Sequence, residues 1–184
     1  MWNFRYFFVY RLNDDSIGIV FNDLTKLLRL AFGLNIHYID NESREYYYTI
    51  NEFPLTLDKK VMLLNHFRKY MKENLKAGAN TEPLEEDQLS RIPALKTWFR
   101  TNKAVVMLLT NGTMQINLLN DHTKIILCPL LKAVTYIDKS MRNRTFRFDL
   151  RERYGCSQEL ARKLDYAYDK VETLLSVIGS PTAS

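Results

Sequence analysis

The chain has 184 residues, of which 46% are hydrophobic and 26% are charged, and its formal net charge at pH 7 is +5. This composition is ordinary for a soluble globular protein and excludes a disordered chain or a collagen-like fibre. No apolar run approaches the roughly 20 residues that a membrane-spanning helix needs, and we expect no membrane or nucleic-acid partner. Two cysteines, Cys128 and Cys156, are too few for a disulfide framework, so a reducing compartment is expected.

The first half is predicted to contain short strands followed by one helix. Segments rich in Tyr, Phe, Val and Ile alternate with turn residues, which is typical of an antiparallel meander; they are 6–12, 16–22, 25–31, 34–40 and 45–50. Beyond them the apolar spacing changes to every third or fourth residue, which predicts an amphipathic helix with Thr56 as N-cap and Gly78 as stop. Its buried face should carry Val61, Leu64, Phe67 (or Arg68), Met71 and Leu75.

The second half repeats this order after a predicted linker at residues 77–93, which combines Gly, Asn, two prolines and an acidic run. Further strands are predicted at 104–109, 113–118, 123–128, 133–137 and 145–150, with a helix from about 157 to 178. The repeated sheet-then-helix order predicts a duplicated α+β unit. The expected organisation is a first domain at 1–76, the linker, a second domain at 94–178 and a flexible tail at 179–184.

Familiar catalytic motifs are absent from the sequence. There is no phosphate-binding loop of the G-x-x-x-x-G-K-[ST] type, no dinucleotide fingerprint and no nucleophile elbow. The three histidines are far apart and lack metal-type spacing with either cysteine. We therefore expect no catalytic residue, no metal and no cofactor, and an enzyme built from scattered residues is the remaining alternative.

One pair of potentially cationic side chains is a candidate for anion binding. If residues 120–128 are extended, His122 and Lys124 point to the same face of a strand, roughly 7 Å apart. Two donors placed in this way could hold an anion between them. From the residues alone, a solvated strand edge is the more common explanation of such a pair.

Residues 89–138 contain Trp98-Phe99-Arg100-Thr101, the Asn111-Gly112-Thr113 turn and Asp121-His122-Thr123-Lys124 in this order. With these pieces the segment resembles the second polo box of the polo-like serine/threonine kinases. Companion signatures are SIGIVFNDLTKLL (16–28), KKVMLLNHFRKYM (59–71) and YGCSQELARKLDYA (154–167). The resemblance runs from about Tyr10 to Leu175. It implies an α+β fold of two polo boxes, each a six-stranded antiparallel sheet packed with an α-helix, forming a groove between them.

The resemblance also implies a function. Such a domain binds protein segments of the Ser-phosphoSer/phosphoThr-Pro type, and it targets and autoinhibits a mitotic kinase by contacting that kinase's own catalytic domain. The implied locations are cytoplasm and nucleus, with centrosome, kinetochore and spindle midzone. The sequence lacks the kinase signatures themselves, so this chain is expected to have no phosphotransferase activity. The alternative is a polo-box module that binds partners independently of phosphate, or that dimerises.

Three groups of site residues follow from the resemblance. The phosphate would be bound by His122 and Lys124. The peptide groove would include Trp2, Leu75, Asn117 and Leu119, and a secondary hydrophobic pocket would include Tyr6, His66, Phe67 and Tyr70. Trp2 lies three residues closer to Leu12 than the family's tryptophan does, so it either reaches the groove through a shorter connection or is only a packing aromatic. Phe67 and Tyr70 have the alternative explanation that both face the core of the first domain.

Overall fold

The structure is a computed structural model, and it describes residues 7–12, 15–30, 34–74 and 93–179, with side chains described as far as Leu174. The chain divides into two compact units, Met1–Ala94 and Leu95–Ser184. We call these the first unit and the second unit. The predicted linker lies outside the described residues except for Pro93, so its boundaries stay a prediction. None of the described helices is long and apolar enough to cross a membrane.

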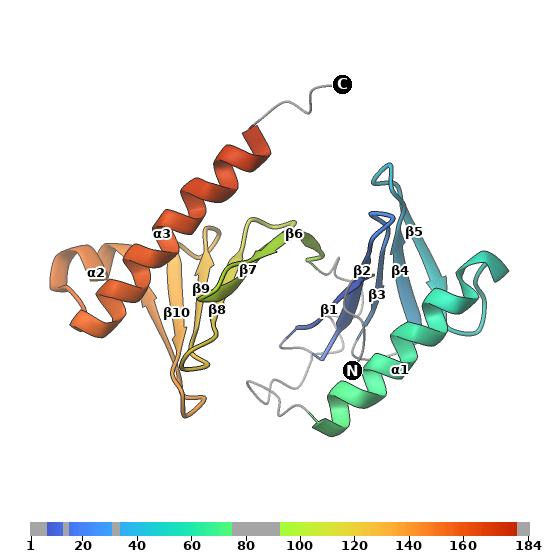
Figure 1. Cartoon of the computed structure of the whole chain (residues 1–184), viewed down its shortest axis with the longest axis horizontal. Coiled ribbons are helices and arrows are strands. Elements are labelled where there is room, and N and C mark those ends of the chain that lie inside the picture. Colours follow the sequence, from blue (N-terminus) through green and yellow to red (C-terminus); the bar gives the residue numbers. More distant parts are fainter. Residues whose placement is uncertain (1–6, 13–14, 31–33, 75–92, 180–184) are drawn as a thin grey trace. The chain divides into compact units, whose positions relative to one another are not determined.

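The first unit is an antiparallel sheet with one helix along one face (Figure 1). The strands are neighbours in chain order: β1 (Phe7–Arg11), β2 (Ile17–Phe21), β3 (Lys26–Arg29), β4 (Asn35–Ile39) and β5 (Glu45–Thr49). A short 3-10 helix, η1 (Leu55–Leu57), leads into α1 (Asp58–Asn74). The described part of this unit thus has five strands, one fewer than the resemblance implied.

Helix α1 covers the sheet with the face that the sequence predicts. Val61, Leu64 and Phe67 are buried and pack against residues of β2, β3 and β4. Thr56 was predicted to cap this helix, and that prediction is wrong, because Thr56 lies inside η1. The predicted stop at Gly78 lies outside the described residues.

Tyr10 and Gly18 form a close cross-strand pair in the first unit. They are directly opposite in the β1–β2 ladder. A β-carbon built on Gly18 would fall within the Tyr10 ring, because that ring lies over the glycine. Both residues are buried. This close approach explains why position 18, in a strand whose other residues are Ile, Val and Phe, is glycine.

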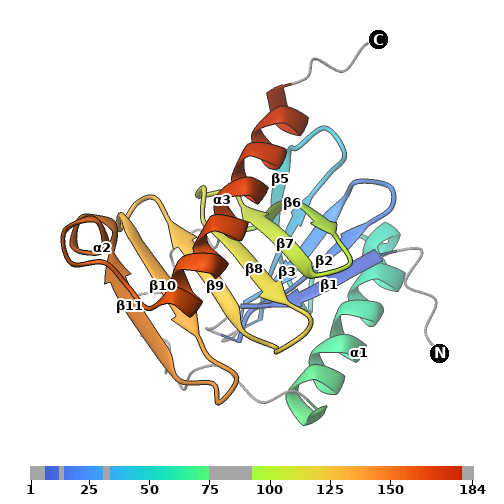
Figure 2. The same ribbon diagram turned by 60° about the vertical axis from the view of Figure 1, so that its left-hand side comes forward.

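The second unit is a six-stranded antiparallel sheet, with its strands also adjacent in chain order. They are β6 (Leu95–Arg100), β7 (Ala104–Leu109), β8 (Met114–Leu118), β9 (Lys124–Cys128), β10 (Ala133–Ile137) and β11 (Asn143–Arg147). Two helices follow, α2 (Phe148–Tyr154) and α3 (Gln158–Gly179), and α3 crosses one face of the sheet (Figures 1 and 2). The α+β class and the sheet-then-helix order of both units are confirmed.

The core of the second unit is formed between α3 and the sheet. Leu160, Leu164 and Ala167 of α3 are buried against residues of β8 and β9. The prediction of a strand at 145–150 is wrong in its second half. The strand ends at Arg147 and Phe148 begins α2, in which Asp149 lies in the first turn and Arg151 and Arg153 in the last, as the helix dipole favours.

Candidate functional site

The connection between β8 and β9 contains His122 in a tight turn. His122 has φ of 58°, in the left-handed region, and the strand begins only at Lys124. The expectation of an extended segment at 120–128 is therefore wrong at its start, and alternation does not fix the direction of the imidazole. The physical reason is the preceding aspartate, whose side chain bonds the backbone two residues on and so favours a turn over a strand.

Asp121 and Thr123 close this turn around His122. One carboxylate oxygen of Asp121, Oδ1, accepts hydrogen bonds from the backbone N–H of Thr123 (3.1 Å) and from its hydroxyl (2.7 Å). The Leu118 N–H donates to the Thr123 carbonyl (2.9 Å), which joins the turn to the last residue of β8. Thr123 is 2% exposed, so these bonds are largely shielded from water.

Lys163 of α3 holds both flanks of the same turn. Its Nζ donates to Asp121 Oδ2 (2.6 Å) and to the Thr123 hydroxyl (2.8 Å). It also donates to the Tyr136 hydroxyl (3.1 Å) and forms an ion pair with Glu159 (3.1 Å). The ammonium group therefore ties the turn to β10 and to α3 through four oxygen atoms.

Charge in this cluster is balanced internally. Burial alone would raise the pKa of Asp121, but the hydrogen bonds from Lys163 and Thr123 outweigh burial and lower the pKa to about 2. Burial would lower the pKa of Lys163, and its bonds to Asp121, Tyr136 and Glu159 outweigh that effect and raise it. Both groups are ionised at neutral pH. The carboxylate beside His122 is thus compensated by a fixed cation.

His122 and Lys124 are available to a ligand. His122 is exposed and Lys124 is half-buried. Across the part of the chain that the structure describes, neither side chain makes a hydrogen bond or ion pair within the protein. Asn117 is directly opposite Lys124 in the β8–β9 ladder, and its Oδ1 accepts a hydrogen bond from Gln115 (2.8 Å). The Leu119 N–H donates to the Lys103 carbonyl (2.8 Å). The structure thus brings together four of the predicted residues at one end of the β8–β9 pair.

The first unit contains a turn with the same construction. Thr25 donates its N–H (3.1 Å) and its hydroxyl (2.7 Å) to Asp23 Oδ1, and Lys60 of α1 donates to Asp23 Oδ2 (2.6 Å) and to the Thr25 hydroxyl (2.5 Å). The residue at the tip is Leu24, with φ of 65° and 69% exposure. Residues 22–26 read N-D-L-T-K and residues 120–124 read N-D-H-T-K. The two turns therefore differ in sequence only at the tip.

This repeat is the signal that sequence reasoning missed. The clamping lysines, Lys60 and Lys163, were not predicted as site residues, because each lies in a helix distant in sequence from its turn. Comparison of the two halves at N-D-x-T-K would have shown the turn, although not its lysine partner. A second turn is also duplicated. Arg44 Nε donates to Asp40 Oδ2 in the first unit and Arg142 Nε donates to Asp138 Oδ2 in the second, at 3.0 Å in both.

The other predicted site residues fall into two groups. Trp2, Tyr6 and Leu75 lie outside the described residues, so both interpretations of Trp2 stay open. On α1, Phe67 is 7% exposed and its ring contacts that of Phe7 (centroids 5.3 Å apart), which confirms it as a core residue.

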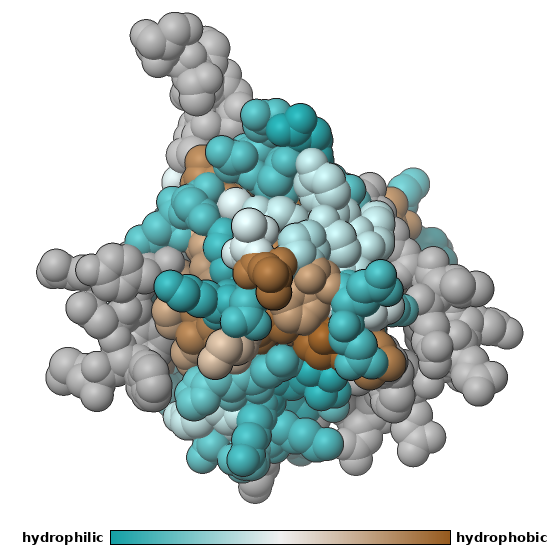
Figure 3. Space-filling view, turned by 90° about the vertical axis from the view of Figure 1, so that its right-hand side faces the viewer, coloured by the Kyte–Doolittle hydropathy of each residue, from teal (hydrophilic) through white to brown (hydrophobic). Residues whose placement is uncertain are grey.

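Tyr70, by contrast, is 51% exposed, so the interpretation that it faces the core is wrong. His66 is also exposed and meets Phe67 edge-on (centroids 5.5 Å apart). Figure 3 shows the side on which α1 and β5 lie in Figure 1, where hydrophobic residues gather within a mostly hydrophilic face.

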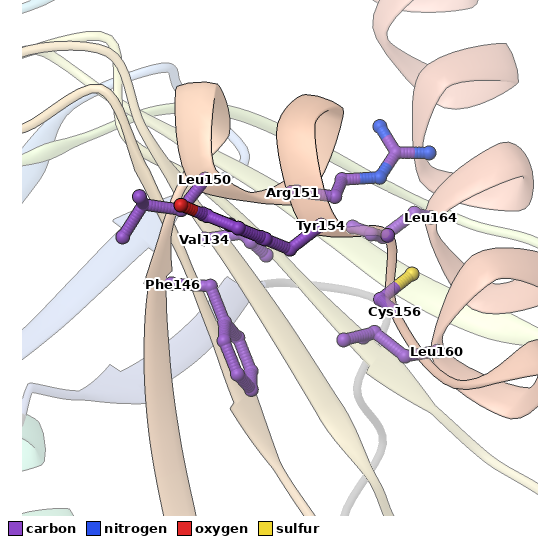
Figure 4. A pocket seen from close by; sticks show the side chains of 9 residues that line it. Val134, Phe146, Leu150, Arg151, Tyr154, Cys156, Leu160 and Leu164 are labelled. Carbon is purple, nitrogen blue, oxygen red and sulfur yellow. The ribbon is translucent and has the colours of Figure 1, made fainter.

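A separate apolar cavity of about 150 Å³ lies in the second unit between α2, α3 and the sheet. It is lined by Val134, Phe146, Leu150, Arg151, Tyr154, Gly155, Cys156, Leu160 and Leu164 (Figure 4). The Arg151 side chain extends toward α3, where it donates to the Tyr168 hydroxyl (3.1 Å). None of the predicted site residues that the structure describes lines this cavity, whose walls are apolar apart from Arg151 and Tyr154.

The chain is a duplicated sheet-and-helix unit, and one of its two equivalent turns carries His122 at the tip and Lys124 beside it. The family model described as "POLO box duplicated region" matches residues 4–61 and 101–164. These segments make up more than half of the chain, and the chain belongs to the polo-box family.

Several known proteins are similar to this chain. It is 49% identical over 173 residues to the serine/threonine-protein kinase PLK1 of Xenopus laevis, a match that covers 94% of this chain and 29% of that protein. It is 47% identical over 172 residues to the serine/threonine-protein kinase polo of Drosophila melanogaster, covering 93% and 30%. The chain thus spans less than a third of these relatives.

Among solved structures, the chain is similar to the budding yeast Cdc5 polo-box domain in complex with a Spc72 phosphopeptide. The TM-score is 0.80 and the identity 28%, and the match covers 94% of this chain and 66% of that one. The same yeast domain in complex with the Dbf4 polo-interacting region gives a TM-score of 0.76 at 28% identity, covering 94% and 68%.

Proposed function

We propose that this chain is the phosphopeptide-binding regulatory domain of a polo-like serine/threonine kinase, in which it targets and autoinhibits the catalytic domain. The observation that carries the proposal is the turn at 120–124, which presents His122 and Lys124 to solvent beside a carboxylate that Lys163 already compensates. A phosphate dianion is the ligand that suits a lysine ammonium beside an imidazole that can donate a hydrogen bond. The similarity to a yeast domain in complex with a phosphopeptide supports the same ligand class.

His122 and Lys124 can supply only part of the free energy of binding a phosphopeptide. Hydrogen bonds to charged groups contribute about 1.5–3 kcal/mol each, so two contribute about 3–6 kcal/mol. Micromolar affinity corresponds to about 8 kcal/mol. The remaining free energy must come from contacts with the rest of the peptide, and Asn117 and Leu119 lie at the same end of the β8–β9 pair. We therefore expect affinity for a phosphorylated peptide and little affinity for phosphate alone.

The test is calorimetric titration with a Ser-phosphoThr-Pro peptide and its unphosphorylated twin. The matched pair of variants is His122→Ala/Lys124→Ala and Leu24→Ala/Lys26→Ala, which removes the corresponding side chains of the first unit. Wild type and the Leu24/Lys26 variant should bind the phosphorylated peptide with micromolar affinity, and the His122/Lys124 variant should not. Equal affinity for both peptides would reject the proposal.

That outcome would favour the rival function, a polo-box module that binds its partners without phosphate. The exposed Tyr70 and Met62 on α1 would then be the side chains to substitute first. For the parent kinase we propose the mitotic locations implied above: centrosome, kinetochore and spindle midzone. Loss of these locations from a tagged parent protein carrying the His122/Lys124 substitutions is the corresponding cellular test.

A further inference from the structure

The turn that carries His122 needs support from outside the β8–β9 connection. Its backbone at residue 122 is left-handed, a conformation that residues other than glycine seldom adopt unless their surroundings hold them there. The hydrogen bonds from Thr123 to Asp121 close the turn locally. Among the residues that the structure describes, Lys163 alone joins both flanking side chains to the helix that packs against the sheet.

Lys163 also removes a charge conflict. Asp121 is the residue immediately before His122, and an uncompensated carboxylate at that position would repel a bound phosphate. Lys163 Nζ lies 2.6 Å from that carboxylate; the Lys163 side chain is 12% exposed and the Asp121 side chain 39% exposed, so solvent screens the pair in part. All four of its oxygen partners belong to the protein, which separates its role from that of Lys124.

The first unit shows that this clamp is independent of the imidazole. Lys60 makes the corresponding bonds to Asp23 and Thr25, and the tip of that turn is Leu24. The clamp is thus part of how an N-D-x-T-K turn is built against a helix. Of these two turns, only the one in the second unit has a side chain at its tip, His122, that can donate a hydrogen bond to a phosphate.

We propose that Lys163 is a positioning residue for phosphopeptide binding, which fixes the turn that presents His122 and neutralises Asp121 without itself touching the phosphate. This inference rests on the proposed function. It predicts that the site can be weakened by a substitution on α3 that leaves His122 and Lys124 in place. It also predicts that the corresponding substitution on α1 has no such effect.

The experiment compares Lys163→Met with Lys60→Met in the full chain, using the Ser-phosphoThr-Pro peptide and its unphosphorylated twin as probes. Lys163→Met should weaken binding of the phosphorylated peptide by about tenfold, which corresponds to about 1.4 kcal/mol. Lys60→Met should bind within twofold of wild type. Thermal unfolding of both variants is the control for stability: each loses the bonds that clamp its turn, and Lys163→Met also loses its contacts with Tyr136 and Glu159.

A second pair of variants separates geometry from charge. Thr123→Val removes the hydroxyl that Lys163 and Asp121 share and leaves every charge in place, whereas Thr123→Ser keeps the hydroxyl. We expect several-fold weaker phosphopeptide binding for the valine variant and near wild-type binding for the serine variant. These variants also keep the proposal testable if Lys163→Met fails to fold.

Two results would overturn the inference and leave the proposed function intact. One is undiminished phosphopeptide binding by both Lys163→Met and Thr123→Val while His122→Ala loses it. The other is an equal loss from Lys163→Met and Lys60→Met, which would indicate general destabilisation. Failure of wild type to distinguish the two peptides would instead reject the proposed function, and the positioning role with it.

Discussion

Because the backbone of His122 is left-handed, we expect an unusual order of stability for the variants with alanine and with glycine at this position. At most exposed positions alanine gives the more stable protein. At position 122 we expect the reverse, because φ is 58° and only glycine adopts this conformation without steric cost. Neither variant has an imidazole, so the difference between the two reports the backbone alone.

The size of the difference follows from two opposing contributions. The left-handed conformation costs a residue with a β-carbon about 1–2 kcal/mol. Glycine avoids this cost but makes the unfolded chain more flexible, which offsets about 0.4–1 kcal/mol. His122→Gly should therefore be more stable than His122→Ala by about 0.8 kcal/mol, the midpoint of these ranges. Both should lose phosphate-dependent peptide binding.

The assay is urea unfolding of four variants, with Asp165 as the control position. Asp165 is exposed in the interior of α3, where glycine should be less stable than alanine by about 1 kcal/mol. The two positions should therefore give differences of opposite sign. If alanine is more stable than glycine at 122 as well, the turn does not have the described backbone and the reasoning is refuted. Retained phosphopeptide binding by His122→Gly would show that the imidazole is not a ligand.

Three further predictions concern stability. Gly18→Ala should lower the free energy of unfolding by about 1–3 kcal/mol, because its β-carbon would overlap the Tyr10 ring, and the added variant Tyr10→Leu should recover part of that loss in urea unfolding. Leu164→Ala should cost about 2–5 kcal/mol in the same assay, since Leu164 is fully buried under the sheet, and a cost below 1 kcal/mol would contradict this packing. The pKa of Asp121 is lowered from 3.8 to about 2, so the folded state binds its proton less readily than the unfolded state does. Its stabilising contribution is complete above pH 3.8 and is lost as pH falls toward 2, and the stability difference between wild type and Asp121→Asn should shrink over that range.

Helices were predictable from sequence because their apolar spacing is regular. The three-residue spacing of Val61, Leu64 and Phe67 identified the buried face of α1, and the four- and three-residue spacing of Leu160, Leu164 and Ala167 did so for α3. In both helices one long face must pack against a sheet, so the pattern repeats over several turns and leaves little ambiguity. These six residues are buried, which confirms this part of each predicted face, and Met71 is partly buried.

Short elements were less predictable because their pairing partners decide them. β6 mixes Lys96, Thr97 and Arg100 with apolar residues, and its pairing with β7 makes it a strand. The change from strand to helix at Phe148 was equally hard to predict, because residues 143–154 are rich in charge and their apolar residues show no regular spacing. The residues alone therefore gave five strands in the second half, and the family resemblance implied the sixth.

The sequence named candidate site residues but did not predict the geometry around them. His122 and Lys124 were selected first as two potential cations and then by resemblance, and their role stays a prediction. The argument from strand alternation failed because Asp121 forms a turn with Thr123. The contact between Lys163 and this turn could not be predicted from the sequence, because it depends on how α3, more than thirty residues later in the chain, packs against the sheet.

The two N-D-x-T-K turns have a consequence for stoichiometry. Each chain carries two copies of the same clamped turn, but only one copy has an imidazole at its tip, and the other has an exposed aliphatic side chain. With the proposed function, one chain binds one phosphate. A ligand phosphorylated at two sites can then gain from its second phosphate only by engaging a second copy of the protein, so any avidity toward clustered phosphosites must arise from assembly of the parent molecules.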